Sequence, residues 1–129
     1  MMKTVSKGWG YELWIENNQL YCGKHLHVLP YKQCSVHYHK NKTETFYVIS
    51  GELLLTYCES IENVPEDQLF YYWVHKADIK SVILTRGDNI NISPYVPHKF
   101  TSNKHYACDF IEFSTFHEDS DSYRIIKGD

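Results

Sequence analysis

The sequence lacks the features that mark membrane, exported and nucleic-acid-binding proteins. No run approaches the roughly 18 consecutive apolar residues that a membrane-spanning helix needs. The N-terminal stretch "MMKTVSKGWG" has no apolar core of the kind found in signal peptides, so we expect a cytoplasmic protein. An excess of one charge is also missing. Lysine and arginine number 13 against 16 aspartates and glutamates, and the net charge of -3 predicts neither a nucleic-acid partner nor a membrane surface.

Paired cysteines are absent as well. The four cysteines are Cys22, Cys34, Cys58 and Cys108. None is in a Cys-x-x-Cys spacing, and three of the four lie inside strand-like runs. In a reducing compartment, cysteines of this kind serve as small buried apolar side chains. We therefore expect these residues to be structural.

Alanine, the best helix former, is nearly missing, whereas tyrosine, valine, isoleucine, phenylalanine and threonine are common. These residues form short runs separated by turn sequences, which indicates a single all-β domain over residues 1–129 with little or no helix. About ten such strands in a small domain need a sandwich or a closed barrel to protect their edges. The expected strands are Tyr11–Ile15, Tyr21–Leu29, Lys32–His39, Thr45–Ile49, Glu52–Cys58, Phe70–His75, Ile79–Leu84, Asn89–Ile92, His98–Ser102 and Tyr106–Ser114.

The stretch "CSVHYHKNKTETFYVISGELLL", residues 34–55, contains the first candidate site. Side chains alternate across a strand, so His37 and His39 share one face and lie about 7 Å apart along it. Glu44 begins the next strand after a short turn, from which its carboxylate can return to the same point. Imidazoles with one carboxylate suit Zn, Fe, Mn, Ni or Co. The two histidines alone are a weak signal, since a solvated strand end gives the same pattern.

A second stretch, "RGDNINISPYVPHKF", has a Gly-Asp turn, an alternating strand, a proline-rich loop and then His98. Together the two stretches resemble the two motifs of the cupin superfamily, the first at about residues 32–51 and the second at about 87–102. In the first motif His37, His39 and Glu44 are followed by Gly51. In the second, the number of residues between Gly87 and His98 matches the family's spacing.

The resemblance implies a double-stranded β-helix, the jelly-roll barrel, with His37, His39, Glu44 and His98 in its mouth. It also implies that these four side chains bind a divalent transition metal: zinc, manganese or iron, or else nickel or cobalt. The departures from the family pattern fall in turns and not at the ligands. They are Tyr31 in place of a glycine, Ser93 in place of a proline, Tyr95 in place of a glycine and Ser102 in place of an asparagine.

Within the superfamily, "GWGYELW", "LYCGKHLHV" and "FIEFSTFHEDSDSYRI" are similar to small mannose-6-phosphate-isomerase-type members. This likeness implies a metal-dependent aldose–ketose isomerase that acts on a monosaccharide or its phosphate. Such a reaction needs a base that moves a proton through an enediol. The candidates for that base or its partner are Glu112, Lys24 and Tyr47.

Strand alternation limits the choice of acid only in part. Phe110 and Glu112 share one face of their strand, and Asp109 and Ile111 share the other. Either register points one acid inward, and the resemblance favours Glu112. Lys24 is compatible with a substrate contact or with an outward position on an edge.

A phosphorylated substrate favours a bidentate arginine. The only arginines are Arg86, in a turn, and Arg124, in the tail, and neither is a compelling phosphate ligand, so a free sugar stays open. We expect the remaining histidines to be structural or at the surface, because no partner spacing recruits them: His25, His27, His75, His105 and His117.

Two other functions fit the same four ligands. One is a non-haem iron dioxygenase, because oxygen chemistry needs open positions on Fe(II). The other is a sugar-binding cupin without turnover that assists surface-glycan biosynthesis. For all three functions the resemblance implies a homodimer, which we expect to form through the N-terminal strands that carry Trp9 and Trp14.

Overall fold

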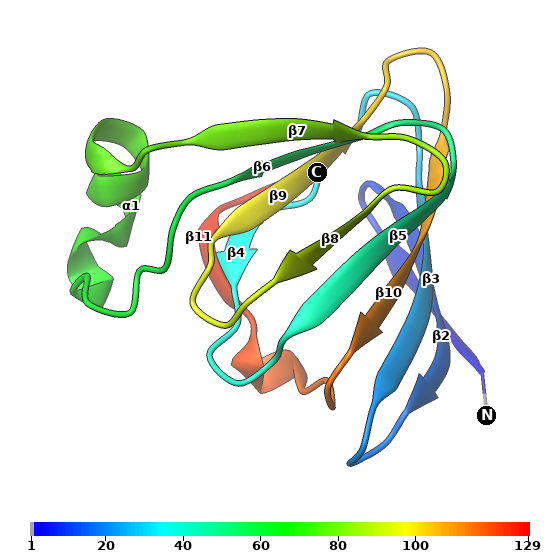
Figure 1. The fold of residues 1–129 in the computed structure, drawn as a ribbon, viewed down its shortest axis with the longest axis horizontal. Coiled ribbons are helices and arrows are strands. Elements are labelled where there is room, and N and C mark those ends of the chain that lie inside the picture. The colour runs from blue at the N-terminus through cyan, green and yellow to red at the C-terminus, as the bar shows by residue number, and fades with distance from the viewer. Residues whose placement is uncertain (1) are drawn as a thin grey trace.

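Figure 1 shows the computed structural model, which describes residues 2–129 as two packed β-sheets. The strands are β1 (Lys3–Lys7), β2 (Gly10–Asn17), β3 (Cys22–Val28), β4 (Val36–Tyr38), β5 (Glu44–Ser50), β6 (Leu53–Tyr57), β7 (Lys80–Leu84), β8 (Asn89–Ile92), β9 (His98–Ser102), β10 (Cys108–Ser114) and β11 (Tyr123–Ile126). The helical turns are η1 (Glu66–Gln68), α1 (Leu69–Tyr71), η2 (Tyr72–Lys76) and η3 (Asp119–Asp121). Among residues 2–129, no helix is long and apolar enough to cross a membrane.

The order of strands in each sheet brings distant parts of the sequence together. One sheet has the order β1-β2-β3-β10-β5-β8, and the other has the order β11-β4-β9-β6-β7. Neighbouring strands are antiparallel throughout residues 2–129. This arrangement confirms the expected all-β jelly roll. It also places β4 and β9, which carry the motif histidines, side by side in one sheet.

Alternation along the strands builds the core between the two sheets. In β3, residues Cys22, Lys24, Leu26 and Val28 are buried, and the residues between them are more exposed. Leu26 and Val28 join the main apolar cluster, which also contains Phe46, Phe100 and Phe110. Burying a side chain of this size stabilises the fold by about 1.5–3 kcal/mol. Lys24 is the exception on this face, because a charged side chain occupies an inward position.

All four cysteines are free and buried. Burial raises the pKa of Cys34 and of Cys108 to about 12 and that of Cys58 to about 11. The pKa of Cys22 is also raised by burial. The thiols are therefore protonated at neutral pH and act as the small apolar side chains that we expected.

The expected strand at Phe70–His75 is wrong, since these residues form α1 and η2. Figure 1 shows this helical segment beyond the ends of β6 and β7. Its Leu69 is buried against Ile61 in a second apolar cluster, and Trp73 packs against the same cluster. A spacing of four residues places Leu69 and Trp73 on one face of a helix. Packing therefore overrides the strand propensity of the aromatic run.

Three further differences concern strands. The expected strand Lys32–His39 is reduced to β4, apart from an isolated bridge between Gln33 and Thr101. Two edge strands, β1 and β11, were not expected. The sequence of β1, "KTVSK", contains one apolar residue, so it gave no strand signal, and β11 becomes recognisable only through its pairing with β4.

The two tyrosines that stand in place of family glycines adopt the backbone conformation of glycine. Tyr31 has φ 58° and Tyr95 has φ 65°, both in the left-handed region. Gly51, which closes the first motif, has φ 79°, and a Cβ added there would lie 2.4 Å from the carbonyl oxygen of Ala107. The turn geometry is thus preserved at Tyr31 and Tyr95 at a cost of about 1–2 kcal/mol each.

Candidate metal centre and its cavity

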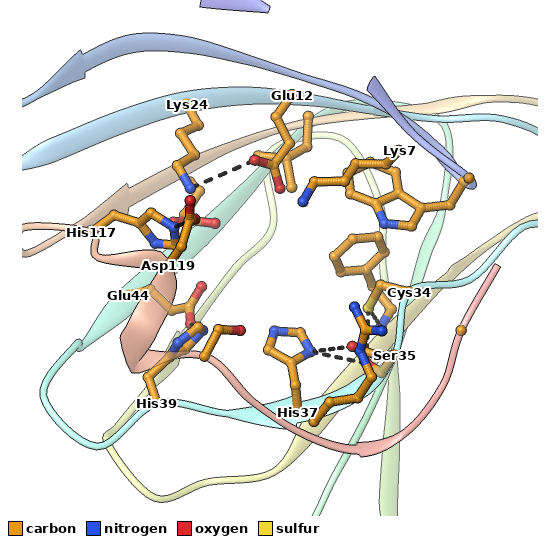
Figure 2. A pocket seen from close by; sticks show the side chains of 18 of the residues that line it. Lys7, Glu12, Lys24, Cys34, Ser35, His37, His39, Glu44, His117 and Asp119 are labelled. Atoms are coloured by element: carbon orange, nitrogen blue, oxygen red, sulfur yellow. Dashed lines mark hydrogen bonds and ion pairs between the residues drawn. The ribbon is translucent and has the colours of Figure 1, made fainter. Parts of the chain in front are cut away.

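Three histidines converge at the inner face of the five-stranded sheet. His37 lies on β4, His39 follows it, and His98 begins β9 directly opposite His37 in the register of the sheet. One ring nitrogen from each histidine lies within 4.8 Å of the others, so the three side chains could hold one metal ion. Figure 2 shows His37 and His39 pointing into the same space.

Each of the three rings is oriented by a hydrogen bond from its Nδ1 to a backbone carbonyl oxygen. The Nδ1 of His37 lies 2.9 Å from the carbonyl oxygen of Ser35, that of His98 lies 2.9 Å from Val96 O, and that of His39 lies 2.8 Å from Asp121 O. A carbonyl only accepts hydrogen bonds, so Nδ1 carries the proton and Nε2 is left with its lone pair. Metal-binding histidines are commonly held in this way.

Glu44 completes the cluster from the other sheet, at the first residue of β5. Its Oε2 lies 3.2 Å from Nε2 of His39 and 3.6 Å from Nε2 of His98. Neither contact has hydrogen-bond geometry, and among the described residues Glu44 Oε2 and His98 Nε2 are buried without a hydrogen-bond partner. Two buried lone-pair atoms without a hydrogen-bond partner, in a cluster of three histidines and one glutamate, fit a bound divalent ion.

The charges of the cluster suit metal binding. Burial, reinforced by the neighbouring histidines, lowers the pKa of His37 well below its ordinary value, and burial also lowers the pKa of His98. Burial alone would raise the pKa of Glu44. Lys42 and the histidines outweigh this effect and lower it. At neutral pH His37 and His98 are therefore neutral and Glu44 is ionised, which are the forms that bind metal.

The cluster forms one wall of a cavity of about 630 Å³. Lys42 and Glu112 are buried beside it, and Lys42 Nζ donates a hydrogen bond to Glu112 Oε2 at 3.0 Å. Burial would lower the pKa of Lys42, but Glu112 and Glu44 outweigh burial and raise it. Glu112 is therefore held beside a permanent positive charge.

His117 extends this network to the mouth of the cavity. Its Nδ1 lies 3.0 Å from Lys42 Nζ and its Nε2 lies 2.9 Å from Asp119 Oδ1. A lysine ammonium can only donate, so Nδ1 of His117 accepts and Nε2–H donates to Asp119. Burial, together with Lys42 and Lys24, lowers the pKa of His117.

The opposite wall carries Lys24 and Glu12, whose Nζ and Oε1 are 3.7 Å apart (Figure 2). Lys24 is only 1% exposed, and its ammonium also lies 4.3 Å from the ring centroid of Trp14. Glu12 accepts a hydrogen bond from Trp14 Nε1 at 2.8 Å. The Lys24 ammonium makes no hydrogen bond within residues 2–129, and Lys24 lines the cavity.

The structure brings most of the predicted site residues together. Glu112 is buried and lines the cavity, whereas Asp109 faces outward. Glu112 is therefore the inward acid of this strand, a choice that alternation alone left open. Lys24 is also inward. Tyr47 is not at the site. It is 42% exposed on the outer face of β5, because the inward positions of that strand belong to residues such as Glu44.

Several residues of the cavity are missing from the sequence-based predictions, and two of them matter most for the site, Lys42 and His117. Lys42 could have been found, because a residue two before Glu44 is directed to the same side when the extended backbone continues. His117, which we expected in a polar loop without a partner, gave no local signal. Its partner Lys42 is 75 positions away in the sequence. His25 and His27 lie on the outer face of the sheet and both bond to Asp109 Oδ1 at 2.8 Å.

Comparisons with known proteins agree with this architecture. A family model described as Cupin matches residues 26–123. The capsular polysaccharide assembling protein CapF from Staphylococcus aureus superposes with a TM-score of 0.76 at 14% identity, over 98% of this chain and 33% of that chain. The formate complex of Lactobacillus farciminis oxalate decarboxylase gives 0.73 at 14% identity over 96% and 34% of the two chains.

Oxalate decarboxylase from Bacillus subtilis at pH 4.6 superposes with a TM-score of 0.75 at 13% identity, over 96% of this chain and 30% of that chain. The chain thus spans about a third of the length of these proteins, and at such low identity the likeness shows the fold alone. No curated protein matches the sequence.

Proposed function

Because the chain belongs to the cupin family, we propose that it is a metal-dependent aldose–ketose isomerase that acts on a monosaccharide or its phosphate. One observation carries this proposal. A cluster suited to a divalent metal shares a single cavity with a buried carboxylate, Glu112, and a buried ammonium, Lys24. An isomerase needs this combination, since it must move one proton between carbons and another between oxygens.

The residues that would hold the metal are His37, His39 and His98, through their Nε2 atoms, and Glu44, through its carboxylate. Zinc, manganese and iron suit this ligand set, as do nickel and cobalt. A divalent ion bound there supplies Lewis-acid stabilisation for the carbonyl and hydroxyl oxygens of a sugar.

Glu112 is the proposed base. Its carboxylate removes the proton from C2 of the aldose while Lys24 donates a proton to the carbonyl oxygen at C1, which gives an enediol. Glu112 then returns its proton to C1, and Lys24 recovers a proton from the hydroxyl on C2 as the ketone forms. Lys42 is a positioning residue for Glu112, because its hydrogen bond fixes the carboxylate at the cavity wall. The outward placement of Tyr47 leaves it without a part in this scheme.

Two measurements test the proposal. Elemental analysis of the purified protein should find about one divalent metal per chain, which is lost in His37→Ala and in Glu44→Ala. Incubation with aldoses, ketoses and their phosphates in deuterated water should then show exchange at C2. Glu112→Gln should abolish the exchange without loss of metal, whereas Glu62→Gln, in an exposed turn, should leave it unchanged. Metal content unaltered in both ligand variants would overturn the site.

The other two functions predict different outcomes of the same experiments. Iron in the protein together with substrate-dependent oxygen uptake would replace the isomerase with a non-haem iron dioxygenase. Tight sugar binding with no exchange at C2 would indicate a binding module without turnover. An isomerase shows exchange without oxygen uptake.

We also propose that the protein is a homodimer, but not through the tryptophans. Trp9 is 6% exposed and packs on Phe100 in the core, and Lys3 and Lys24 cover Trp14. The outer face of the six-stranded sheet is a better surface, because it exposes large apolar side chains: Tyr11, Ile15, Tyr47, Ile49 and Phe113. Light scattering at micromolar concentration should give twice the chain mass, and a monomeric mass would refute the dimer.

A further inference from the structure

The cationic side chains that line the cavity are not all paired. Lys42 bonds to Glu112, and Lys24 lies close to Glu12. Within the part of the chain that the structure describes, the other three make no hydrogen bond or ion pair through their side chains: Lys7, Arg124 and Lys127. Figure 2 shows Lys7 directed into the same space as Glu12 and Lys24. The cavity lining therefore has three cationic side chains that no carboxylate of residues 2–129 holds.

The carboxylates of the cavity are, by contrast, all engaged. Each has a partner or belongs to the metal cluster: Glu12 with Trp14, Glu44 with the histidines, Glu112 with Lys42, Asp119 with His117 and Asp129 with the backbone N–H of Gln33. The five lysines and arginines of the lining are matched in number by five carboxylates, but three of the cations have no bonded partner among the described residues that an entering anion must displace.

Arg124 has the most informative position of the three cations. It lies on β11 directly opposite His37 on β4. Side chains that face each other across an antiparallel pair lie on the same side of the sheet, with Cβ atoms about 4.5–5.5 Å apart. The guanidinium is thus attached next to a proposed metal ligand. Since Arg124 is exposed and unpaired, a ligand can bind it without breaking an existing ion pair.

We propose that Arg124 binds a carboxylate or phosphate group of the ligand, so that the substrate is an acidic sugar, either a sugar acid or a sugar phosphate. A guanidinium presents two parallel N–H donors that match either group, which a lysine cannot do. Lys7 and Lys127 add to the positive potential at the mouth. The sugar part of this inference rests on the proposed function, whereas the anion site does not.

The test is calorimetric titration of the zinc-loaded protein with glucose, glucuronate and glucose 6-phosphate at one ionic strength. We expect at least one of the two anions to bind about 10-fold or more tightly than glucose, as one charge-assisted bidentate contact allows. Arg124→Gln should reduce that preference to within about 2-fold. The control is Arg86→Gln, which removes an exposed arginine outside the cavity and should keep the preference.

The two anions identify the group that Arg124 binds, and a preference for one or for both supports the site. Because a carboxylate can also bind zinc directly, the difference between the two arginine variants decides the matter. The inference fails if neither anion binds more tightly than glucose, or if Arg124→Gln keeps the preference. Anion binding that depends on Arg124 without any exchange at C2 would overturn the isomerase and leave the anion site standing.

Discussion

At the scale of single residues, burial decides what an ion pair contributes. The Lys42–Glu112 pair has an N–O distance of 3.0 Å and is buried on both sides. The Lys40–Glu66 pair is shorter, at 2.6 Å, but Glu66 is 69% exposed. Removing one partner of a buried pair leaves an unpaired charge away from water and costs about 3–5 kcal/mol. An exposed pair contributes less than about 1 kcal/mol.

Lys42→Met should therefore lower the free energy of unfolding by about 3–5 kcal/mol, because Glu112 and Glu44 lose their buried counter-charge. Urea denaturation of the metal-free protein measures this change. Lys40→Met is the matched control and should have a much smaller effect, because water screens this exposed pair. The double variant Lys42→Met/Glu112→Leu should recover part of the loss. Equal effects of the two lysine variants would show that burial is not the deciding factor.

The carboxyl group of Asp109 allows a prediction of how stability depends on pH. Although burial works in the opposite direction, hydrogen bonds from His27 and His25 lower the pKa of this carboxyl. Its stabilising contribution is therefore present above the pKa of the unfolded chain, about 3.9, and is lost as the pH falls through the lower folded value. Asp109→Asn should be less stable than the wild type by about 1 kcal/mol at pH 6, and the difference should shrink below about pH 4.

Unfolding in urea at pH 6, 5, 4 and 3 checks this prediction, with the difference between the two proteins as the readout. Other carboxyl groups titrate in both proteins and cancel in that difference. A difference that stays constant down to pH 3 would show that the Asp109 carboxylate does not stabilise the fold through its charge.

How far the sequence predicts the site depends on how local each residue's signal is. His37 and His39 are placed by alternation along one strand, and Glu44 and His98 by motif spacing. The sequence alone places Arg124 in the tail, because only the pairing of β11 with β4 brings it to His37. That pairing joins distant segments and leaves no periodic trace in the sequence around residue 124.

At the scale of elements, the two tyrosines with positive φ allow a test of turn strain. Tyr31 is 75% exposed, so removing its ring loses little packing. Tyr31→Gly should relieve about 1–2 kcal/mol of backbone strain. The greater freedom of glycine in the unfolded chain should cancel part of this gain in stability. We expect a net gain of about 0.5 kcal/mol, or about 2 °C in melting temperature.

Calorimetry of Tyr31→Gly beside Tyr31→Ala separates strain from the loss of the ring, because alanine keeps the strained backbone. Only the glycine variant should gain stability, and an equal effect of both would contradict the account. Tyr95 serves as a contrast. Its ring stacks on Tyr38 at 6.2 Å in the second apolar cluster, so Tyr95→Gly should not gain.

The type of an element could be predicted where a strand has one buried face. The prediction failed where contacts with distant residues decide the conformation. The inner strands β3 and β5 alternate in burial, and their sequences show it. The run "FYYWVH" has the composition of a strand, yet it is helical, because Leu69 and Trp73 need one common face to cover the second cluster. A local pattern of aromatic residues cannot distinguish these two solutions.

At the scale of the whole molecule, the proposed metal ligands join the two sheets. His37 and His98 belong to the five-stranded sheet, and Glu44 belongs to the six-stranded one. Metal that binds the folded chain should stabilise it by about 2.7 kcal/mol at a free concentration 100-fold above the dissociation constant. For a chain of this size that is a rise in melting temperature on the order of 8 °C.

Thermal unfolding of the chelator-treated protein, before and after addition of zinc, measures this rise. Glu44→Gln should lose most of it, because the charged ligand from the second sheet is removed, and Glu62→Gln should keep it. If the wild type shows no rise, the four residues do not form a metal site that couples the sheets.

The buried cysteines have a practical consequence for following how the molecule opens. Cys22 and Cys108 lie on neighbouring strands of one sheet, Cys34 lies just before β4, and Cys58 follows β6 in the other. Because each thiol is shielded and protonated in the folded chain, an alkylating reagent reaches it only when its surroundings open. Mass spectrometry of timed alkylation therefore follows the opening of each region separately, with no engineered label.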